Sequence, residues 1–207
     1  MRDTLKLGLV LMTIAGIAGV GVGYVNTLAA PLIEKQILEE KISSFKEVYP
    51  AGEKVEDETA KYLTTPDPII KEVNISYRSG VPAAVIYLVQ SKGYSGLITM
   101  LAGFDLSSSR ITAVKILSQT ETPGLGAKSK DPLFQNRFRD KASDVELEVT
   151  KAPPSKENQI QAITASTITS KAVTRGVNAA REHFISTFTN RKRNEKHGMT
   201  KAGQPVK

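Results

Sequence analysis

The most constraining feature of the sequence is a long uncharged segment near its start. Leu7 to Ile33 forms 27 consecutive residues without a charged side chain. As a helix such a segment is about 40 Å long, which exceeds the roughly 30 Å hydrocarbon core of a bilayer. A cleaved signal peptide is the alternative, but the apolar core of such a peptide has only about 7–15 residues. We therefore predict a retained transmembrane helix over residues 7–30.

The flanking charges predict how this helix is oriented. Arg2 and Lys6 precede it with one acid, Asp3, whereas the five charged residues that follow it, up to Lys41, sum to −1. Because the cytoplasmic flank of a membrane helix carries the excess of Lys and Arg, residues 1–6 are expected in the cytoplasm. The remainder is then expected on the outer side of a bacterial cytoplasmic membrane.

Composition removes several classes of protein. The chain has no cysteine, which excludes disulfides, thiol nucleophiles and iron–sulfur clusters ligated by its own cysteines. Its net charge of +7 raises the possibility of nucleic-acid binding, but residues 191–207 carry +5 of that charge. The basic character therefore belongs to a tail, which we expect to be disordered, and we expect no nucleic-acid partner.

Hydropathy periods divide the remaining chain. Apolar residues at 3- and 4-residue steps after Pro31 predict an amphipathic stalk helix that stops near Tyr49, and residues 31–60 are read as this stalk and a linker. Residues 61–190 are read as one α+β domain with an antiparallel sheet and flanking helices. The expected elements are strands at Ile70–Tyr77, Ala84–Val89, Leu97–Phe104, Ile111–Leu117 and Val145–Val149, and a helix at Pro132–Asp140.

A glycine-containing segment follows the last long strand. Glu121–Lys128 reads ETPGLGAK, in which Pro123-Gly124 is a type II turn signal and Gly126 permits close backbone approach. Such a loop can bring its amides near a flat ligand. An ordinary surface turn is the alternative, and composition alone favours it.

A cluster of hydroxyl residues forms the second unusual segment. Thr164–Ser170 reads TASTITS, and the apolar face of the sequence after it predicts a helix that begins there. Unpaired N–H groups and the positive end of the helix dipole make this position an anion site. Helix capping is the alternative, although one hydroxyl would be enough for a cap.

These two segments, together with Gly93-Tyr94-Ser95-Gly96 before a strand, resemble covalent FMN-binding domains. That family includes the G subunit of Rnf electron transport complexes and the C subunit of the sodium-pumping NADH:quinone reductase. The resemblance implies an electron-relaying flavoprotein subunit of an ion-translocating ferredoxin:NAD⁺ oxidoreductase. Its partners would be membrane, iron–sulfur and flavin subunits, and a flavin transferase for maturation. No separate catalytic activity is expected of this chain.

The resemblance also assigns site residues. FMN would be attached by a phosphoester to Thr167, with Ser166 as the second choice of acceptor. Around it, the cofactor-binding residues would be Tyr94, Glu121, Thr122, Gly124, Leu125, Gly126, Thr164, Ala165, Ser166, Ile168 and Thr169.

The chain departs from the family pattern at four positions. Gln119 stands where a His is common, Gln161 where an acid is usual, and Ala165-Ser166 replaces Gly-Ala. The departures at Gln161, Ala165 and Ser166 leave open a structural or assembly subunit that carries no flavin, and an anchored ligand-sensing module is a separate alternative. His183 and His197 form no metal-ligand pattern, so no metal site is expected.

Overall fold

The computed structural model describes residues 2–189, with side chains described for residues 6–30 and 39–189. The predicted tail at 191–207 lies outside the described residues. Two compact units divide at residues 42 and 43.

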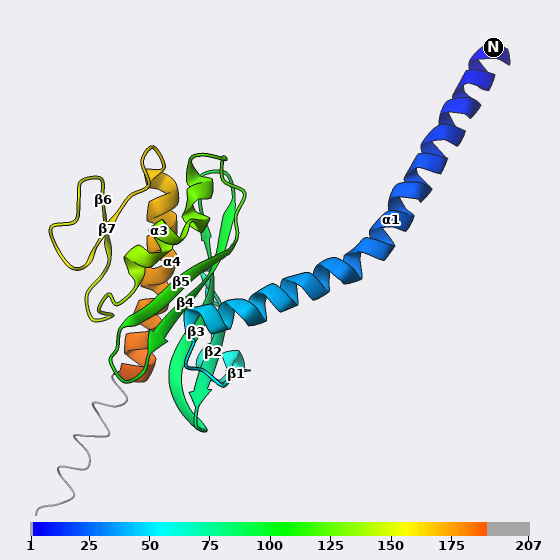
Figure 1. Ribbon diagram of the computed structural model, residues 1–207. Helices are drawn as coiled ribbons and strands as arrows, with labels where there is room; N and C mark the ends of the chain where they lie inside the picture. The colour runs from blue at the N-terminus through cyan, green and yellow to red at the C-terminus, as the bar shows by residue number, and fades with distance from the viewer. Residues whose placement is uncertain (1, 190–207) are drawn as a thin grey trace, which may run out of the picture. The chain divides into compact units, whose positions relative to one another are not determined.

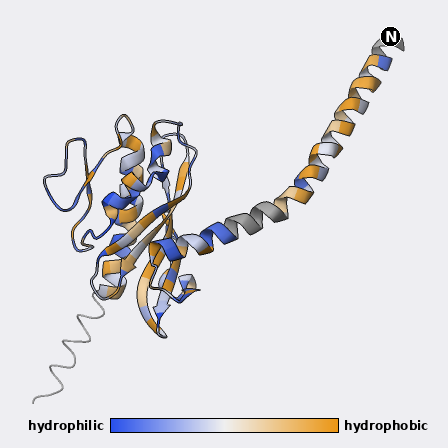
Figure 2. Ribbon diagram, viewed as in Figure 1, coloured by the Kyte–Doolittle hydropathy of each residue, from blue (hydrophilic) through white to orange (hydrophobic). Residues whose placement is uncertain are grey.

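Helix α1 (Arg2–Val48) passes through Pro31 without interruption and ends next to Tyr49, as the periodicity predicts. Its Lys6–Ala30 segment is long and apolar enough to cross a membrane. Figure 2 shows the predominantly hydrophobic colour of this segment and the more hydrophilic residues toward the end of α1.

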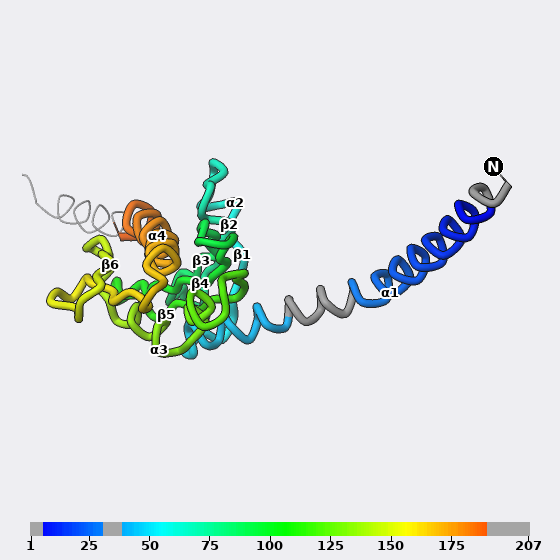
Figure 3. The backbone as a smooth tube through the Cα atoms, turned by 90° about the horizontal axis from the view of Figure 1, so that it is seen from above, coloured from blue at the N-terminus to red at the C-terminus, as the bar shows by residue number. Residues whose placement is uncertain are grey.

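Five antiparallel strands form the sheet of the second unit, in the order β1-β2-β3-β4-β5. They are β1 (Lys54–Asp57), β2 (Ile70–Arg78), β3 (Val81–Lys92), β4 (Leu97–Asp105) and β5 (Ile111–Ser118). Helix α4 (Thr167–Phe184) lies lengthwise along one face of this sheet (Figures 1 and 3). The predicted fold class, α+β with an antiparallel sheet after an apolar N-terminal helix, is confirmed.

Both faces of the sheet are buried. Successive residues of its central strands point to opposite faces, so they join two different cores. Val85, Tyr87 and Val89 of β3 join a large core with Val173, Val177 and Phe184 of α4. The intervening Ala84 and Ile86 pack on the other face against Phe45, Val48 and Tyr49, at and just after the end of α1.

Several elements differ from the predictions. Strand β1 and the first two residues of helix α2 (Thr59–Tyr62) lie in the range assigned to the stalk and linker, and β1 belongs to the sheet. The predicted helix at Pro132–Asp140 is two shorter pieces, α3 (Pro132–Gln135) and the 3-10 turn η2 (Asn136–Phe138). The predicted strand at Val145–Val149 shrinks to β6 (Glu148–Thr150), which pairs in parallel with the unpredicted β7 (Gln159–Gln161). The remaining short elements are η1 (Gly126–Lys130), a 3-10 helix, and η3 (Ile185–Thr189), a π-helix.

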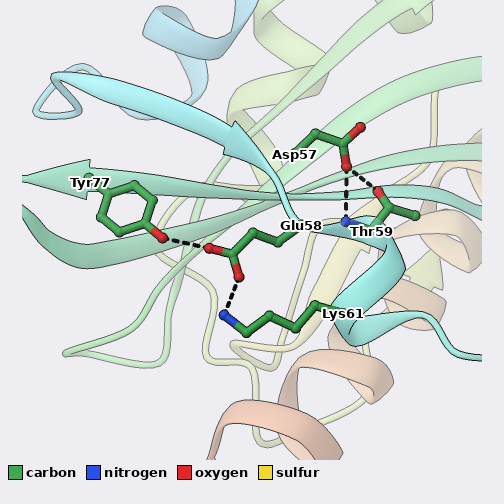
Figure 4. Close-up of polar contacts among 5 residues, drawn as sticks. All are labelled: Asp57, Glu58, Thr59, Lys61 and Tyr77. Carbon is green, nitrogen blue, oxygen red and sulfur yellow. Dashed lines mark hydrogen bonds and ion pairs between the residues drawn. The ribbon is translucent and has the colours of Figure 1, made fainter.

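Hydrogen bonds around Glu58 explain why β1 joins the sheet although its sequence, KVED, has little strand pattern (Figure 4). The Tyr77 hydroxyl of β2 donates to Glu58 Oε1 at 2.5 Å, and Lys61 Nζ donates to Glu58 Oε2. Thr59 Oγ1 accepts a hydrogen bond from the Val73 N–H at 2.9 Å. The residues after β1 are therefore tied to β2 by side chains as well as by the strand ladder.

The connection between β7 and α4 contains a strained residue. Ala165 has φ = +60°, the left-handed region that favours glycine. It stands at the position where the family pattern has Gly, and it adopts the glycine-type conformation. This conformation carries a cost of about 1–2 kcal/mol for a residue with a Cβ atom.

We predict that Ala165→Gly raises the free energy of unfolding by about 1 kcal/mol, because relief of strain exceeds the entropy that glycine adds to the unfolded chain. The measurement is urea unfolding of the full chain in detergent. The control is Ala179→Gly within α4, which is expected to lower stability by about the same amount. A destabilised Ala165→Gly would contradict the strain assignment.

The Glu58 cluster predicts a pH dependence. Hydrogen bonds from Lys61 and then Tyr77 lower the pKa of Glu58, and the bond to Glu58 raises the pKa of Tyr77 to about 12. A lowered carboxyl pKa stabilises the folded chain above the ordinary value of 4.5, and this stabilisation is lost as the pH falls through the folded-state pKa. The difference in unfolding free energy between the unmodified chain and Glu58→Gln should therefore shrink below about pH 4.5. A Glu58→Gln difference that is constant across this pH range would show that the carboxylate charge contributes nothing.

Tyr77→Phe, which removes one hydrogen bond to Glu58, should lower the free energy of unfolding by about 1 kcal/mol at neutral pH.

Candidate functional site

A cavity of about 440 Å³ lies between the loop after β5 and the start of α4. We call it the first cavity. It is lined by Tyr94, Glu121, Thr122, Leu125, Gly126, Ala165, Ser166, Thr167, Ile168 and Thr169. Its size falls in the range of small-molecule and cofactor sites, which is about 300–1,000 Å³.

Three separate segments of sequence meet in this cavity. Ten of the twelve residues that the sequence predicts for the site line it. Gly124 lies exposed at the tip of the loop, and Thr164 lines a different, smaller cavity beside Arg137. The geometry thus gathers most of the predicted set, while their binding role stays a prediction.

The loop after β5 is shaped by its glycines. Gly124 has φ = +78°, and the Leu125 N–H donates to the Thr122 carbonyl at 3.1 Å, which matches the predicted turn at Pro123-Gly124. A Cβ atom at Gly126 would lie 2.5 Å from Glu121 Oε2 and 2.6 Å from Thr169 Oγ1. Any side chain at position 126 would therefore push the loop away from α4.

Glu121 is a buried carboxylate, only 6% exposed, that connects the walls of the cavity. The Ser95 N–H donates to its Oε1 at 2.9 Å, and the Thr169 hydroxyl donates to its Oε2 at 2.5 Å. The turn before β4, the loop after β5 and the first turn of α4 thus share one acceptor group. Sequence reasoning did not single out Ser95, although the Gly93–Gly96 motif contains it.

The first turn of α4 presents unpaired donors. Among the described residues, the backbone N–H groups of Thr167, Ile168 and Thr169 have no hydrogen-bond partner. Ser166 occupies the N-cap position, yet its side chain makes no capping hydrogen bond. Its hydroxyl is buried, with the residue 6% exposed, and has no partner among the described residues.

These observations bear on the two interpretations of the hydroxyl cluster, helix capping and anion binding. A capping role for Ser166 would pair its hydroxyl with a backbone N–H of the first turn, and this pairing is not formed. A buried unpaired hydroxyl costs about 1–3 kcal/mol, so the arrangement suits a ligand that supplies hydrogen-bond partners. Free amides at the positive end of a helix dipole are an arrangement that favours anions such as phosphate.

The apolar residues of the cavity suit the other part of such a ligand. Tyr94, Leu125 and Ile168 line it with 71%, 43% and 55% of their surface exposed. Apolar side chains beside a phosphate-type site match a cofactor that has both a flat ring system and a phosphate. A nucleotide-like cofactor such as FMN therefore fits the residues present.

In the described part of the chain, no group of three or more His, Cys, Asp or Glu residues is placed to hold a metal ion. His183 instead bridges elements at the other end of α4: its Nδ1 lies 3.0 Å from the Tyr87 hydroxyl and its Nε2 lies 3.1 Å from the Tyr62 carbonyl oxygen. His197 lies outside the described residues.

Comparison with known proteins agrees with this interpretation. The family model described as "FMN-binding domain" matches residues 93–182, a range that contains every residue of the first cavity. The crystal structure of Shewanella oneidensis NqrC superposes with a TM-score of 0.50 at 15% identity, covering 71% of this chain and 87% of that one, and supports the fold.

Two curated relatives extend over most of the chain. The G subunit of the Na(+)-translocating ferredoxin:NAD(+) oxidoreductase complex of Acetobacterium woodii is 34% identical, covering 84% of this chain and 87% of the relative. The G subunit of the ion-translocating oxidoreductase complex of Methanosarcina acetivorans is 28% identical, covering 87% and 95% respectively. The chain therefore belongs to the FMN-binding domain family and, within it, to the G subunits of ion-translocating oxidoreductase complexes.

Proposed function

We propose that this chain relays electrons through an FMN that is held in the first cavity and attached by a phosphoester to Thr167. The observation that carries the proposal is the start of α4, where the buried unpaired hydroxyl of Ser166 precedes Thr167 and the N–H groups of residues 167–169 are free. Thr167 is half-buried and lines the cavity, whereas Ser166 is buried. Accessibility therefore favours Thr167 over Ser166 as the acceptor.

The residues of the cavity have distinct roles in this proposal. The amides of the first turn of α4 hold the phosphate, and the helix dipole favours its negative charge. Glu121 fixes Thr169, which keeps this turn in register with the loop that covers the ring system. Tyr94, Leu125 and Ile168 shield the ring from water on its apolar side. When bound, FMN supplies the redox chemistry, and the protein supplies position and electrostatics.

The relatives' names support a place in a larger assembly. The chain would be the G subunit of an ion-translocating ferredoxin:NAD⁺ oxidoreductase complex, passing electrons between other membrane, iron–sulfur and flavin subunits. In this role it is an electron-transfer subunit of the complex enzyme and catalyses no reaction by itself. A flavin transferase would install the cofactor.

Membrane association is supported by the Lys6–Ala30 helix and by the membrane-complex relatives. We further propose a single pass through the bacterial cytoplasmic membrane with the N-terminus inside. The excess of Lys and Arg before the span supports this orientation.

The departures from the family pattern leave the cavity intact, which favours the flavin carrier over a subunit that binds no flavin. Ala165 takes up the left-handed conformation at the family's glycine position. Gln161 lies in β7 and does not line the first cavity.

The attachment site is tested by expressing the full chain with a flavin transferase and measuring flavin fluorescence that stays with the denatured polypeptide. We expect Thr167→Ala to abolish this fluorescence, because the acceptor hydroxyl is lost. Thr167→Ser should keep it, and the control Ser166→Ala should keep it as well. Loss in Ser166→Ala with retention in Thr167→Ala would move the attachment to Ser166. Absence of fluorescence in the unmodified chain would support the subunit without flavin.

The orientation is tested by cysteine labelling, because the chain has no cysteine of its own. Ser79→Cys lies at the exposed tip of the β2–β3 hairpin, and Thr4→Cys lies on the other side of the apolar segment. In spheroplasts, a membrane-impermeant maleimide should label Ser79→Cys and leave Thr4→Cys unlabelled until the membrane is permeabilised. The reverse pattern would place the domain in the cytoplasm.

A further inference from the structure

A second cavity of about 550 Å³ adjoins the first, and Ile168 lines both. It lies between the β3–β4 connection and the first half of α4, with Leu97, Lys171 and Arg175 among its lining residues. The two cavities therefore lie next to each other at the start of α4, with Ile168 in the wall of both.

The second cavity is cationic. Lys92, Lys171 and Arg175 line it, and its lining includes no Asp or Glu. The Arg175 guanidinium is fixed in place, because Nη2 donates to the Lys92 carbonyl at 2.7 Å and Nε donates to Ser91 Oγ at 3.2 Å. Lys92 and Lys171 are exposed, and neither forms an ion pair with the side chains that the structure describes.

Exposed apolar side chains gather around these two neighbouring cavities. Residues 43–189 expose seven large apolar side chains, and four of them, Tyr94, Leu97, Leu125 and Ile168, line the two cavities. Clusters of exposed apolar residues with a charged rim are typical of interaction sites. Aromatic and aliphatic anchors of this kind usually form the centre of a protein interface.

We propose that this surface docks the electron-transfer partner of the flavin site, and that the partner presents carboxylates around an apolar centre. We call it the docking face and define it by Lys92, Tyr94, Leu97, Leu125, Ile168 and Lys171. The proposal rests on the proposed function, because electron transfer weakens steeply with distance and a redox partner must approach the mouth of the first cavity. Charge complementarity selects an acidic partner, since every charged side chain that lines the second cavity is basic.

An anionic lipid surface has the same charge as an acidic protein. Three residues of the docking face, however, Tyr94, Leu125 and Ile168, also line the first cavity, and a lipid surface seated on them would cover the flavin site without offering an electron acceptor. An acidic protein surface that carries a redox centre satisfies both the charge and the access requirement.

The test uses the assembled complex with the double variant Lys92→Glu/Lys171→Glu, which leaves the fixed Arg175 in place. We expect covalent flavin content and chemical reduction by dithionite to be unchanged. The rate of flavin reduction or reoxidation by the rest of the complex should fall about tenfold, because charge reversal on an interface rim mainly slows productive association. The salt dependence of that rate should also reverse.

The matched control is Lys151→Glu/Lys156→Glu, which makes the same charge change on two exposed lysines between β6 and β7. This control should keep the rate of the unmodified complex. A docking-face variant that also keeps that rate and its salt dependence would overturn the proposal.

A photo-crosslinking residue at Leu97 separates the partner classes. We expect a crosslink to another protein subunit that is weakened by Lys92→Glu/Lys171→Glu. Crosslinking only to lipid, with a rate effect that depends on anionic lipid in nanodiscs, would assign the face to the membrane surface instead. The crosslink does not require flavin, so it is also measured in Thr167→Ala. If this variant loses the flavin and keeps the crosslink, the docking face is supported independently of the flavin. The docking proposal and the proposed function can therefore fail separately.

Discussion

The buried carboxylate of Glu121 is the interaction on which the geometry of the site depends. A carboxylate out of water is costly unless hydrogen bonds satisfy it, and here Ser95 and Thr169 provide them. These donors come from the turn before β4 and the first turn of α4, so satisfying one acid brings three distant parts of the sequence together. Thr169 is then fixed in the same turn as Thr167 and next to Ile168, which places the free donors of α4 at the cavity.

Much of the fold could be predicted from the sequence because its signals are local. Strand β2 alternates apolar and polar residues, β3 and β4 are mostly apolar runs between turn signals, and β2, β4 and β5 begin at the predicted residues. Strand β1 was missed because its four residues are held by pairing with β2 and by the contacts of Glu58 and Thr59 with that strand, not by their own pattern. The Pro132–Asp140 segment was read as one helix because the turn that divides it has no glycine or proline signal.

The segments that form the site could be predicted from the sequence, but the contacts between them could not. Its loop and helix start were found from glycine and hydroxyl clustering, and the resemblance joined them to Tyr94. The hydrogen bond between Glu121 and Thr169 could not be predicted, because 48 residues separate them and only tertiary packing brings them together. The positive φ of Ala165 could not be predicted either, since alanine itself does not favour that conformation.

The two-sided burial of β3 limits where this domain can change length. Its successive residues belong alternately to the α4 core and to the core around Val48, so one inserted residue would send each side chain to the wrong face. Insertions and deletions are therefore compatible with the hairpin tip at Ser79-Gly80 and with the exposed segment between β6 and β7. Both segments are exposed and lie outside the two cores. Fusions and tags in this unit belong at those two positions.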